Sequence, residues 1–227
     1  MAIHYRIAID GPAGAGKSTA AKALAKALNI RYLDTGAMYR AMALFALQNG
    51  VDPGDGEAVE RLLPTADISV RFTEEGQRVL LGETDVTGLI RTPEVSMGAS
   101  RIGVHPCVRI KLADMQRQAA RDYPVVMDGR DITTNVLPDT PYKFFITASP
   151  EERARRRLNE LREKGNVSET TESVLGDIQK RDANDSGRAF MPLKVAEDAT
   201  VVDTTGMTVD EVTACMLRCI RAKEGKE

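Results

Sequence analysis

The sequence predicts an α/β fold in which helices flank a five-stranded parallel sheet. Short apolar segments with strand composition alternate along the chain with longer segments of helical pattern. Such apolar runs are typical of parallel strands buried on both faces. Five segments have this character: 7–9, 31–34, 124–128, 142–147 and 200–203. A second observation, the alternating pattern of residues 68–86, predicts a small antiparallel insertion within this β/α order.

The first strand is followed by a glycine-rich turn and an alanine-rich helix. Gly11, Gly16, Lys17 and Ser18 match G-x-x-x-x-G-K-[ST], the pattern of a phosphate-binding P-loop. Backbone N–H groups of such a loop surround the phosphates, and the helix N-terminus adds its positive dipole end. The motif predicts a P-loop NTPase fold in which Lys17 reaches the β- and γ-phosphates and Ser18 coordinates Mg²⁺. The residues predicted to bind the nucleoside triphosphate are Gly11, Pro12, Ala13, Gly14, Ala15, Gly16, Lys17, Ser18 and Thr19.

The elements of the next hundred residues lead into the predicted insertion. Turn residues, alternating apolar residues and cap residues mark their limits. In order, we expect a strand at 31–34, a helix capped by Thr35 and running to about Gln48, a loop at 49–56, a hairpin turning at 74–77 and extended by 84–86, a helix starting at Thr92-Pro93, and a helix over about 106–121. The insertion therefore covers about residues 51–120, between two core segments at about 1–50 and 121–227 of a single domain.

The β/α order resumes in the second core segment. Ser149-Pro150-Glu151-Glu152 is a capping-box pattern with proline at the first helical position. A long helical stretch follows at 169–186, then the strand 200–203 and a last helix capped by Thr208 with Glu211.

Polar residues follow three of the predicted strands, where an open α/β sheet binds its ligands. Besides the P-loop, these are "DTGAMYR" (34–40) and "DGRD" (128–131). Asp128 has the position of a Walker-B carboxylate that holds Mg²⁺. An aspartate that caps the following turn is the alternative interpretation.

Arginines are concentrated in the segment 153–162. A basic run is usually a solvated helix face, and this interpretation stays open for Arg153 and Arg155. In a chain with a phosphate loop, such a segment can instead close over a triphosphate. The glycine-containing "EKGN" (163–166) would supply the bend of a short lid over about 153–168.

Composition narrows the function classes. The net charge is −2, so no bulk positive field indicates nucleic-acid binding. Three cysteines without a C-x-x-C arrangement and only two histidines argue against a disulfide framework, a His-rich metal site and a His-based triad. The first strand begins almost at Met1, and no apolar run approaches about 18 residues, so we expect neither a signal peptide nor a membrane span. The expectation is a cytoplasmic monomer.

The ordered set of these motifs resembles the bacterial cytidylate kinases. It consists of "GPAGAGKST", "DTGAMYR", "IRTPEVSMGAS" (90–100), "VR" (108–109), "DGRDI" (128–132) and "RDANDSGRAFMPL" (181–193), and the resemblance runs from about residue 4 to 220. It implies a nucleoside-monophosphate-kinase fold, whose monophosphate-binding insert matches the predicted insertion. The implied activity is the transfer of phosphate from ATP, with Mg²⁺, to CMP or dCMP.

The resemblance also implies roles for individual residues. Arg40, Arg130 and Arg188 would hold the acceptor phosphate, Asp185 and Arg181 the ribose, and Arg157 would serve the lid. Ser100, Arg109 and Asp131 would read cytosine, next to Thr35 and Tyr39 of the acceptor site. Lys17, Arg130, Arg188 and Arg157 are the implied catalytic residues.

The chemistry needs no general base, because the attacking phosphate oxygen is largely ionised at neutral pH with a second pKa of about 6. A kinase of UMP, AMP or shikimate is the alternative within the class. A switch-type NTPase is the rival class, but the chain has neither an N-K-x-D motif nor an L-S-G-G-Q signature.

Overall fold

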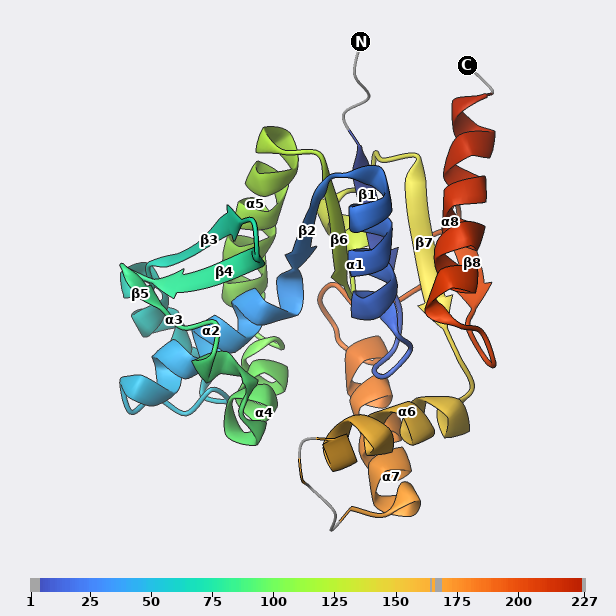
Figure 1. Ribbon diagram of the computed structural model, residues 1–227. Helices are drawn as coiled ribbons and strands as arrows, with labels where there is room; N and C mark the ends of the chain where they lie inside the picture. Colours follow the sequence, from blue (N-terminus) through green and yellow to red (C-terminus); the bar gives the residue numbers. More distant parts are fainter. Residues whose placement is uncertain (1–4, 164, 166–168, 226–227) are drawn as a thin grey trace. The chain divides into compact units, whose positions relative to one another are not determined.

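In the computed structural model, which describes residues 5–163, 165 and 169–225, a five-stranded parallel sheet has the order β2-β6-β1-β7-β8 (Figure 1). Its strands are β1 (Arg6–Asp10), β2 (Arg31–Asp34), β6 (Val125–Gly129), β7 (Tyr142–Thr147) and β8 (Thr200–Asp203). All five predicted strands and the α/β fold class are thereby confirmed. Across these described ranges, no helix combines the length and apolar character that a membrane crossing requires.

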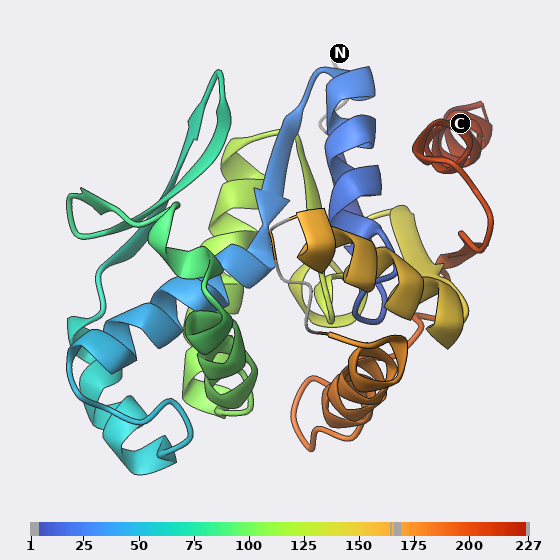
Figure 2. The ribbon, with the colours of Figure 1, turned by 60° about the horizontal axis from the view of Figure 1, so that its bottom comes forward.

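The chain divides into two compact units, Met1–Ile30 with Val126–Glu227, and Arg31–Val125. The helices of the first unit are α1 (Lys17–Leu28), α6 (Pro150–Glu163), α7 (Thr171–Ser186) and α8 (Val209–Glu224). Helix α1 packs against α8. Helices α6 and α7 lie side by side in both views (Figures 1 and 2), joined by an apolar cluster of Ala154, Leu158, Val174 and Ile178.

The strands of the first unit carry its core. Ile7, Ala8 and Ile9 of β1 are fully buried, and β1 pairs in parallel with β7, which brings Ile9 opposite Phe144. Burial of successive residues, rather than of every second one, is what a parallel strand covered on both faces requires. This burial explains why residues 7–9 of β1 are apolar without interruption.

The second unit contains the predicted insertion. Its elements are α2 (Thr35–Gln48), α3 (Gly56–Leu62), β3 (Ile68–Thr73), β4 (Gly76–Leu81), β5 (Thr84–Asp85), α4 (Pro93–Ile102) and α5 (Pro106–Asp122). Strands β3, β4 and β5 form a separate antiparallel sheet with Val70 opposite Val79, so the hairpin is confirmed. Helix α3, which the sequence analysis did not predict, begins after Asp55, whose side chain accepts the Ala58 N–H.

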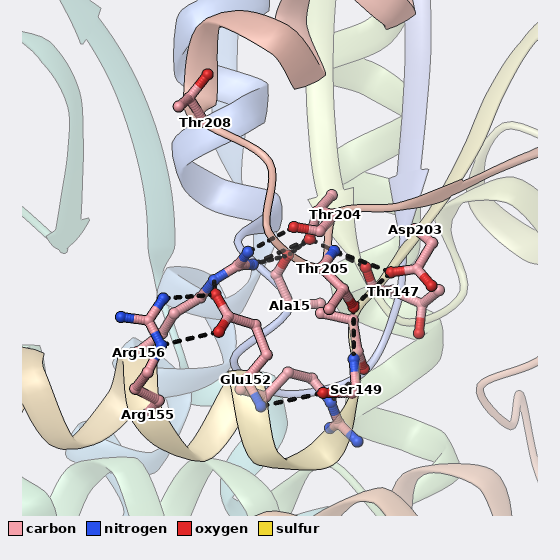
Figure 3. Close-up of polar contacts among 12 residues, drawn as sticks. Ala15, Thr147, Ser149, Glu152, Arg155, Arg156, Asp203, Thr204, Thr205 and Thr208 are labelled. Carbon is pink, nitrogen blue, oxygen red and sulfur yellow. Dashed lines mark hydrogen bonds and ion pairs between the residues drawn. The ribbon is translucent and has the colours of Figure 1, made fainter.

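Two helix caps differ from the predictions. Asp34, not Thr35, caps α2 by accepting the Ala37 N–H at 2.9 Å, and Thr35 is the first helical residue. The Ser149 hydroxyl caps α6 as expected, accepting the Glu152 N–H at 3.2 Å. The Glu152 carboxylate, however, does not complete a capping box, because it accepts hydrogen bonds from Arg155 and Arg156 instead (Figure 3).

The other predicted caps are confirmed. Thr92 caps α4, and Thr208 and Glu211 form the complete capping box of α8. The three cysteines are free thiols, as their spacing predicts.

Candidate active site

The predicted phosphate-binding segment, residues 11–19, consists of the turn between β1 and α1 and the first three residues of α1, in the first unit. Gly16 has a φ of +85°, a left-handed conformation that favours glycine, and it precedes the first residue of α1. Because glycine has no side chain to cap the helix, the N–H groups of the first turn face the loop uncapped. Gly11 is required for packing, since a Cβ there would lie 1.9 Å from the Ile146 carbonyl oxygen of β7. This geometry fits an anion at the helix N-terminus.

Lys17 is the cation of this loop. Its Nζ donates to the Pro12 carbonyl oxygen at 2.7 Å, and the residue is buried. Burial lowers the pKa of Lys17 well below its ordinary value, and the positive charge of Arg130 lowers it further, against the opposing effect of Asp128. Burying a cation beside another cation is electrostatically unfavourable, and the negative charge of a bound polyphosphate would offset this cost.

Ser18 and Asp128 bring two hard oxygens together beside the loop. Asp128 lies near the end of β6 and is buried, and its Oδ2 accepts the Ser18 hydroxyl at 2.8 Å. A P-loop hydroxyl and a carboxylate at this strand end are the donor set with which P-loop NTPases hold Mg²⁺. The residues present therefore fit the ion.

Two arginines of the first unit that the sequence analysis assigned to the acceptor phosphate form a charge network around Asp185. Arg130 Nε donates to Asp185 Oδ2 at 2.6 Å, and Arg188 Nη2 donates to Asp185 Oδ1. Burial would raise the pKa of Asp185, but the two guanidinium groups outweigh burial and lower it. Two arginines held side by side by one carboxylate present a positive surface suited to a phosphate.

Asp131 follows Arg130 and is buried. The turn behind it, residues 132–136, is held by Asp10, a fully buried residue at the end of β1. Asp10 accepts the Ile132 N–H at 3.0 Å, the Thr133 N–H at 2.7 Å and the Thr133 hydroxyl at 2.6 Å. Sequence analysis did not single out Asp10, although an aspartate at the end of a buried strand is a signal that could have found it.

The arginine-rich helix α6 divides into buried and exposed side chains. Arg153 is buried against the loop, so the solvated-face interpretation is wrong for this residue. Arg155 has 63% of its side chain exposed, as that interpretation expects. Arg157, the implied lid residue, is half-exposed and pairs with Glu160 at 3.1 Å. Of the predicted lid, Lys164 and 166–168 lie outside the described residues.

Arg181 lies on α7 of the first unit, and the second unit holds Thr35, Tyr39, Arg40, Ser100 and Arg109. Arg40 Nη2 pairs with Asp34 Oδ2 at 2.7 Å, while its Nε is buried and has no hydrogen-bond partner in the described part of the chain. Gln77 of β4 accepts the Asp34 N–H at 2.6 Å and donates to the Asp34 carbonyl at 3.2 Å. Gln77, which nothing in the local sequence indicated, therefore holds the strand end that orients Arg40.

Arg109 and Tyr39 lie together in the same unit. The Arg109 guanidinium is buried, donates to the Gly103 carbonyl at 3.0 Å, and lies 5.6 Å from the centre of the Tyr39 ring. A buried guanidinium fixed by a carbonyl and an aromatic face is a rigid hydrogen-bonding group. Thr35, at the start of α2, is buried, and Ser100 lies on α4.

The chain is similar to known proteins over nearly its whole length. The family model described as cytidylate kinase matches residues 7–222. The chain is 50% identical over 218 residues to the cytidylate kinase of Carboxydothermus hydrogenoformans, covering 96% of this chain and 98% of that one. It is 48% identical to the cytidylate kinase of Shouchella clausii, with 97% and 98% covered.

A solved structure of an uncharacterized protein from Eubacterium ventriosum shares the fold, with a TM-score of 0.53, 16% identity, and 95% and 97% of the two chains covered. The sequence relatives are far above the identity at which homologues share a family, and they span nearly the whole chain. The chain belongs to the cytidylate kinase family.

Proposed function

We propose that this protein transfers the γ-phosphoryl group of ATP to CMP or dCMP, giving ADP and CDP or dCDP. Membership of the cytidylate kinase family supports the reaction. The observation that carries the proposal is the buried Lys17 ammonium at the uncapped N-terminus of α1, with Arg130 near enough to lower its pKa. We further propose that the enzyme works as a cytoplasmic monomer in pyrimidine nucleotide metabolism.

The donor ATP would bind along residues 11–19. The loop amides and the N-terminus of α1 would bind the β- and γ-phosphates, and Lys17 would exchange the Pro12 carbonyl for a phosphate oxygen. Phosphoryl transfer is catalysed mainly by positioning and by neutralising charge, so these groups supply most of what the reaction needs.

Mg²⁺ fits the oxygens of Ser18 and Asp128, and when bound it would neutralise charge on the transferring phosphoryl group. The two residues hold each other at 2.8 Å by a hydrogen bond. The same contact orients the Ser18 hydroxyl before nucleotide arrives.

The acceptor phosphate would bind to Arg130, Arg188 and Arg40, and the ribose to Asp185 with Arg181. Arg130 and Arg188 are already held by Asp185, so they lose little conformational freedom when the phosphate binds. For the base, Asp131 would accept from the cytosine N4 amino group, while Arg109 and Ser100 would donate to its acceptors. Thr35 and Tyr39 would complete the acceptor site, and Arg157 would serve the lid.

A panel assay tests the proposal. ADP release from ATP is measured with CMP, dCMP, UMP, AMP or shikimate as acceptor, and without an acceptor. We expect rapid release with CMP and dCMP only. Preference for another acceptor would identify a different small-molecule kinase, and release that does not depend on an acceptor would identify a switch-type NTPase.

The Lys17→Ala variant tests the role of the loop. We expect kcat to fall at least about a hundredfold, equivalent to about 2.7 kcal/mol, because no other loop side chain can neutralise the transferring charge. Far-UV circular dichroism should be unchanged. A loss of no more than about tenfold would contradict the role given to Lys17.

A further inference from the structure

Two arginines of α6 bind the backbone of the phosphate loop. Arg153 and Arg156 are three residues apart and therefore lie on the same side of the helix. Arg153 Nη1 donates to the Ala13 carbonyl at 3.0 Å, and Arg156 Nη1 lies 3.4 Å from the Ala15 carbonyl. Figure 2 shows α6 passing across the loop that precedes α1.

Arg156 is held in place from several directions (Figure 3). Its Nε donates to Glu152 at 2.8 Å, one turn earlier in α6. Its Nη1 and Nη2 donate to the Thr204 hydroxyl at 2.9 Å and to the Thr204 carbonyl at 2.6 Å. The guanidinium therefore joins α6, the segment after β8 and the phosphate loop.

Thr204 contributes a second contact to the same carbonyl. Its hydroxyl lies 3.2 Å from the Ala15 carbonyl oxygen and 3.0 Å from that of Thr147, and its N–H donates to Thr147 at 2.8 Å. One hydroxyl has one proton, which the two carbonyls share, while the oxygen accepts from Arg156. Thr204 is buried, so water does not compete for these contacts.

Because the peptide bond is planar, the contacts of the Ala15 carbonyl also orient the N–H of the next residue, Gly16. In a planar trans peptide, the carbonyl of one residue and the N–H of the next point in opposite directions. Holding the Ala15 carbonyl toward Arg156 and Thr204 therefore directs the Gly16 N–H to the other side of the loop. Gly16 has no side-chain constraint of its own, and its left-handed φ of +85° is open to alternatives unless a neighbour fixes it.

We propose that Arg156 and Thr204 are positioning residues for the donor nucleotide, which aim the Gly16 N–H at the phosphates of ATP by holding the Ala15 carbonyl. The proposal rests on the proposed ATP site. Neither residue belongs to the set that the sequence analysis assigned to ATP. Their contribution is preorganisation, because a loop already fixed in its binding conformation loses less entropy when ATP binds.

The chain offers a matched control for each residue. Arg155 also donates to Glu152, at 2.7 and 2.8 Å, but is mostly exposed and has its described contacts with Glu152, not the loop. Arg156→Met and Arg155→Met therefore both remove a partner of Glu152, and only the first removes a contact with Ala15. Thr204→Val removes the hydroxyl at nearly constant volume, and Thr204→Ser keeps it.

The measurements are Kd for Mg²⁺-bound non-hydrolysable ATP by calorimetry, KM for ATP and CMP, and melting temperature. We expect Arg156→Met and Thr204→Val to weaken binding of the analogue and raise KM for ATP by about tenfold each, the effect of one hydrogen bond. KM for CMP should change by less than about twofold. Arg155→Met and Thr204→Ser should bind the analogue as the unmodified chain does.

The outcomes separate this proposal from the function on which it rests. If the unmodified chain does not bind the analogue, the proposed ATP site fails. If it binds but Arg156→Met and Thr204→Val bind equally well, the positioning role is overturned. Equal rises of KM for ATP and CMP also overturn it, because they indicate a general loss of structure. Should Arg156→Met not fold, the comparison of Thr204→Val with Thr204→Ser decides.

Discussion

Asp10 is a carboxylate removed from water and held by three donors from one turn. Burial raises its pKa to about 6, against the opposing effect of the hydrogen bonds from Thr133. The folded chain thus binds a proton more tightly than the unfolded chain, whose aspartate has a pKa of about 3.8. The stability from this proton is fully present below about pH 4 and is lost as the pH rises through about 6.

Asp10→Asn makes this dependence measurable. The quantity to follow is the stability advantage of the unmodified chain, that is, its free energy of unfolding minus that of the variant. This difference should fall by up to roughly 3 kcal/mol between about pH 4 and pH 6 and then stay level. Urea unfolding at several pH values provides the measurement. A difference that rises with pH would mean that the pKa of Asp10 is lowered.

Base choice is the second prediction for a single residue. Cytosine offers an N4 amino donor and an N3 acceptor, whereas uracil offers the reverse at both positions. With Asp131 as acceptor, UMP leaves buried polar groups unpaired, so kcat/KM for UMP should be about ten- to a hundredfold below that for CMP. Asp131→Asn should narrow this gap, mainly through poorer use of CMP. Equal kcat/KM for the two nucleotides in the unmodified chain would contradict the role given to Asp131.

Single residues also show what the sequence could and could not predict. Lys17, Ser18 and Gly16 were predictable because the P-loop is a local pattern with a fixed chemical purpose. The contacts of Asp10 and Thr204 were not predictable, because Asp10 binds a turn more than 100 residues later in the sequence and Thr204 binds Ala15 more than 100 residues earlier. The environment of Arg153 was ambiguous in the sequence, because a basic helical segment has the same composition whether its side chains face solvent or a loop.

At the scale of elements, helix α8 depends on its capping box. The Thr208 hydroxyl accepts the Glu211 N–H at 3.3 Å, and the Glu211 carboxylate accepts the Thr208 N–H at 2.8 Å. Thr208→Ala should lower the free energy of unfolding by about 1 kcal/mol, because it leaves an N–H of the first turn without a partner. Thermal or urea unfolding measures the change. Thr208→Ser keeps a capping hydroxyl and should recover most of the loss, and an equal loss in both variants would exclude the cap as the cause.

Helix α6 has the same pattern at its start but a different outcome. The Glu152 carboxylate accepts hydrogen bonds from Arg155 and Arg156. These arginines lower the pKa of Glu152 to about 2, and the hydrogen bond from Arg155 has the largest effect. The strands, most helix limits and the antiparallel hairpin followed from local pattern and were confirmed. The capping-box pattern did not predict the partners of Glu152, because it takes no account of the charged residues nearby. Helix α3, only seven residues long, is too short for a clear periodic signal.

For the molecule as a whole, Tyr5 links the first strand segment to the last helix of the same unit. The Tyr5 hydroxyl donates to Glu224 Oε1, and this hydrogen bond raises the pKa of Tyr5 to about 12. Tyr5→Phe should lower the free energy of unfolding by about 1 kcal/mol, the net value of one hydrogen bond. The difference from the unmodified chain should be constant below about pH 10 and shrink as the pH approaches 12.

Urea unfolding at pH 7 and pH 9 tests the first part of this expectation, with Glu224→Gln as the partner variant. The two changes should not add, because each removes the same contact. Additive losses would show that Tyr5 and Glu224 act separately.

The contact between Tyr5 and Glu224 bears on how the chain can be rearranged. Segments that meet in space can be joined by a short linker, and new ends can then be opened at an exposed turn. The turn between β3 and β4, at Glu74 and Glu75, is exposed and lies in the other unit. A circularly permuted chain that starts at Glu75 would begin and end within the antiparallel sheet. It would leave the phosphate loop inside an uninterrupted first unit, with both ends free to carry a reporter.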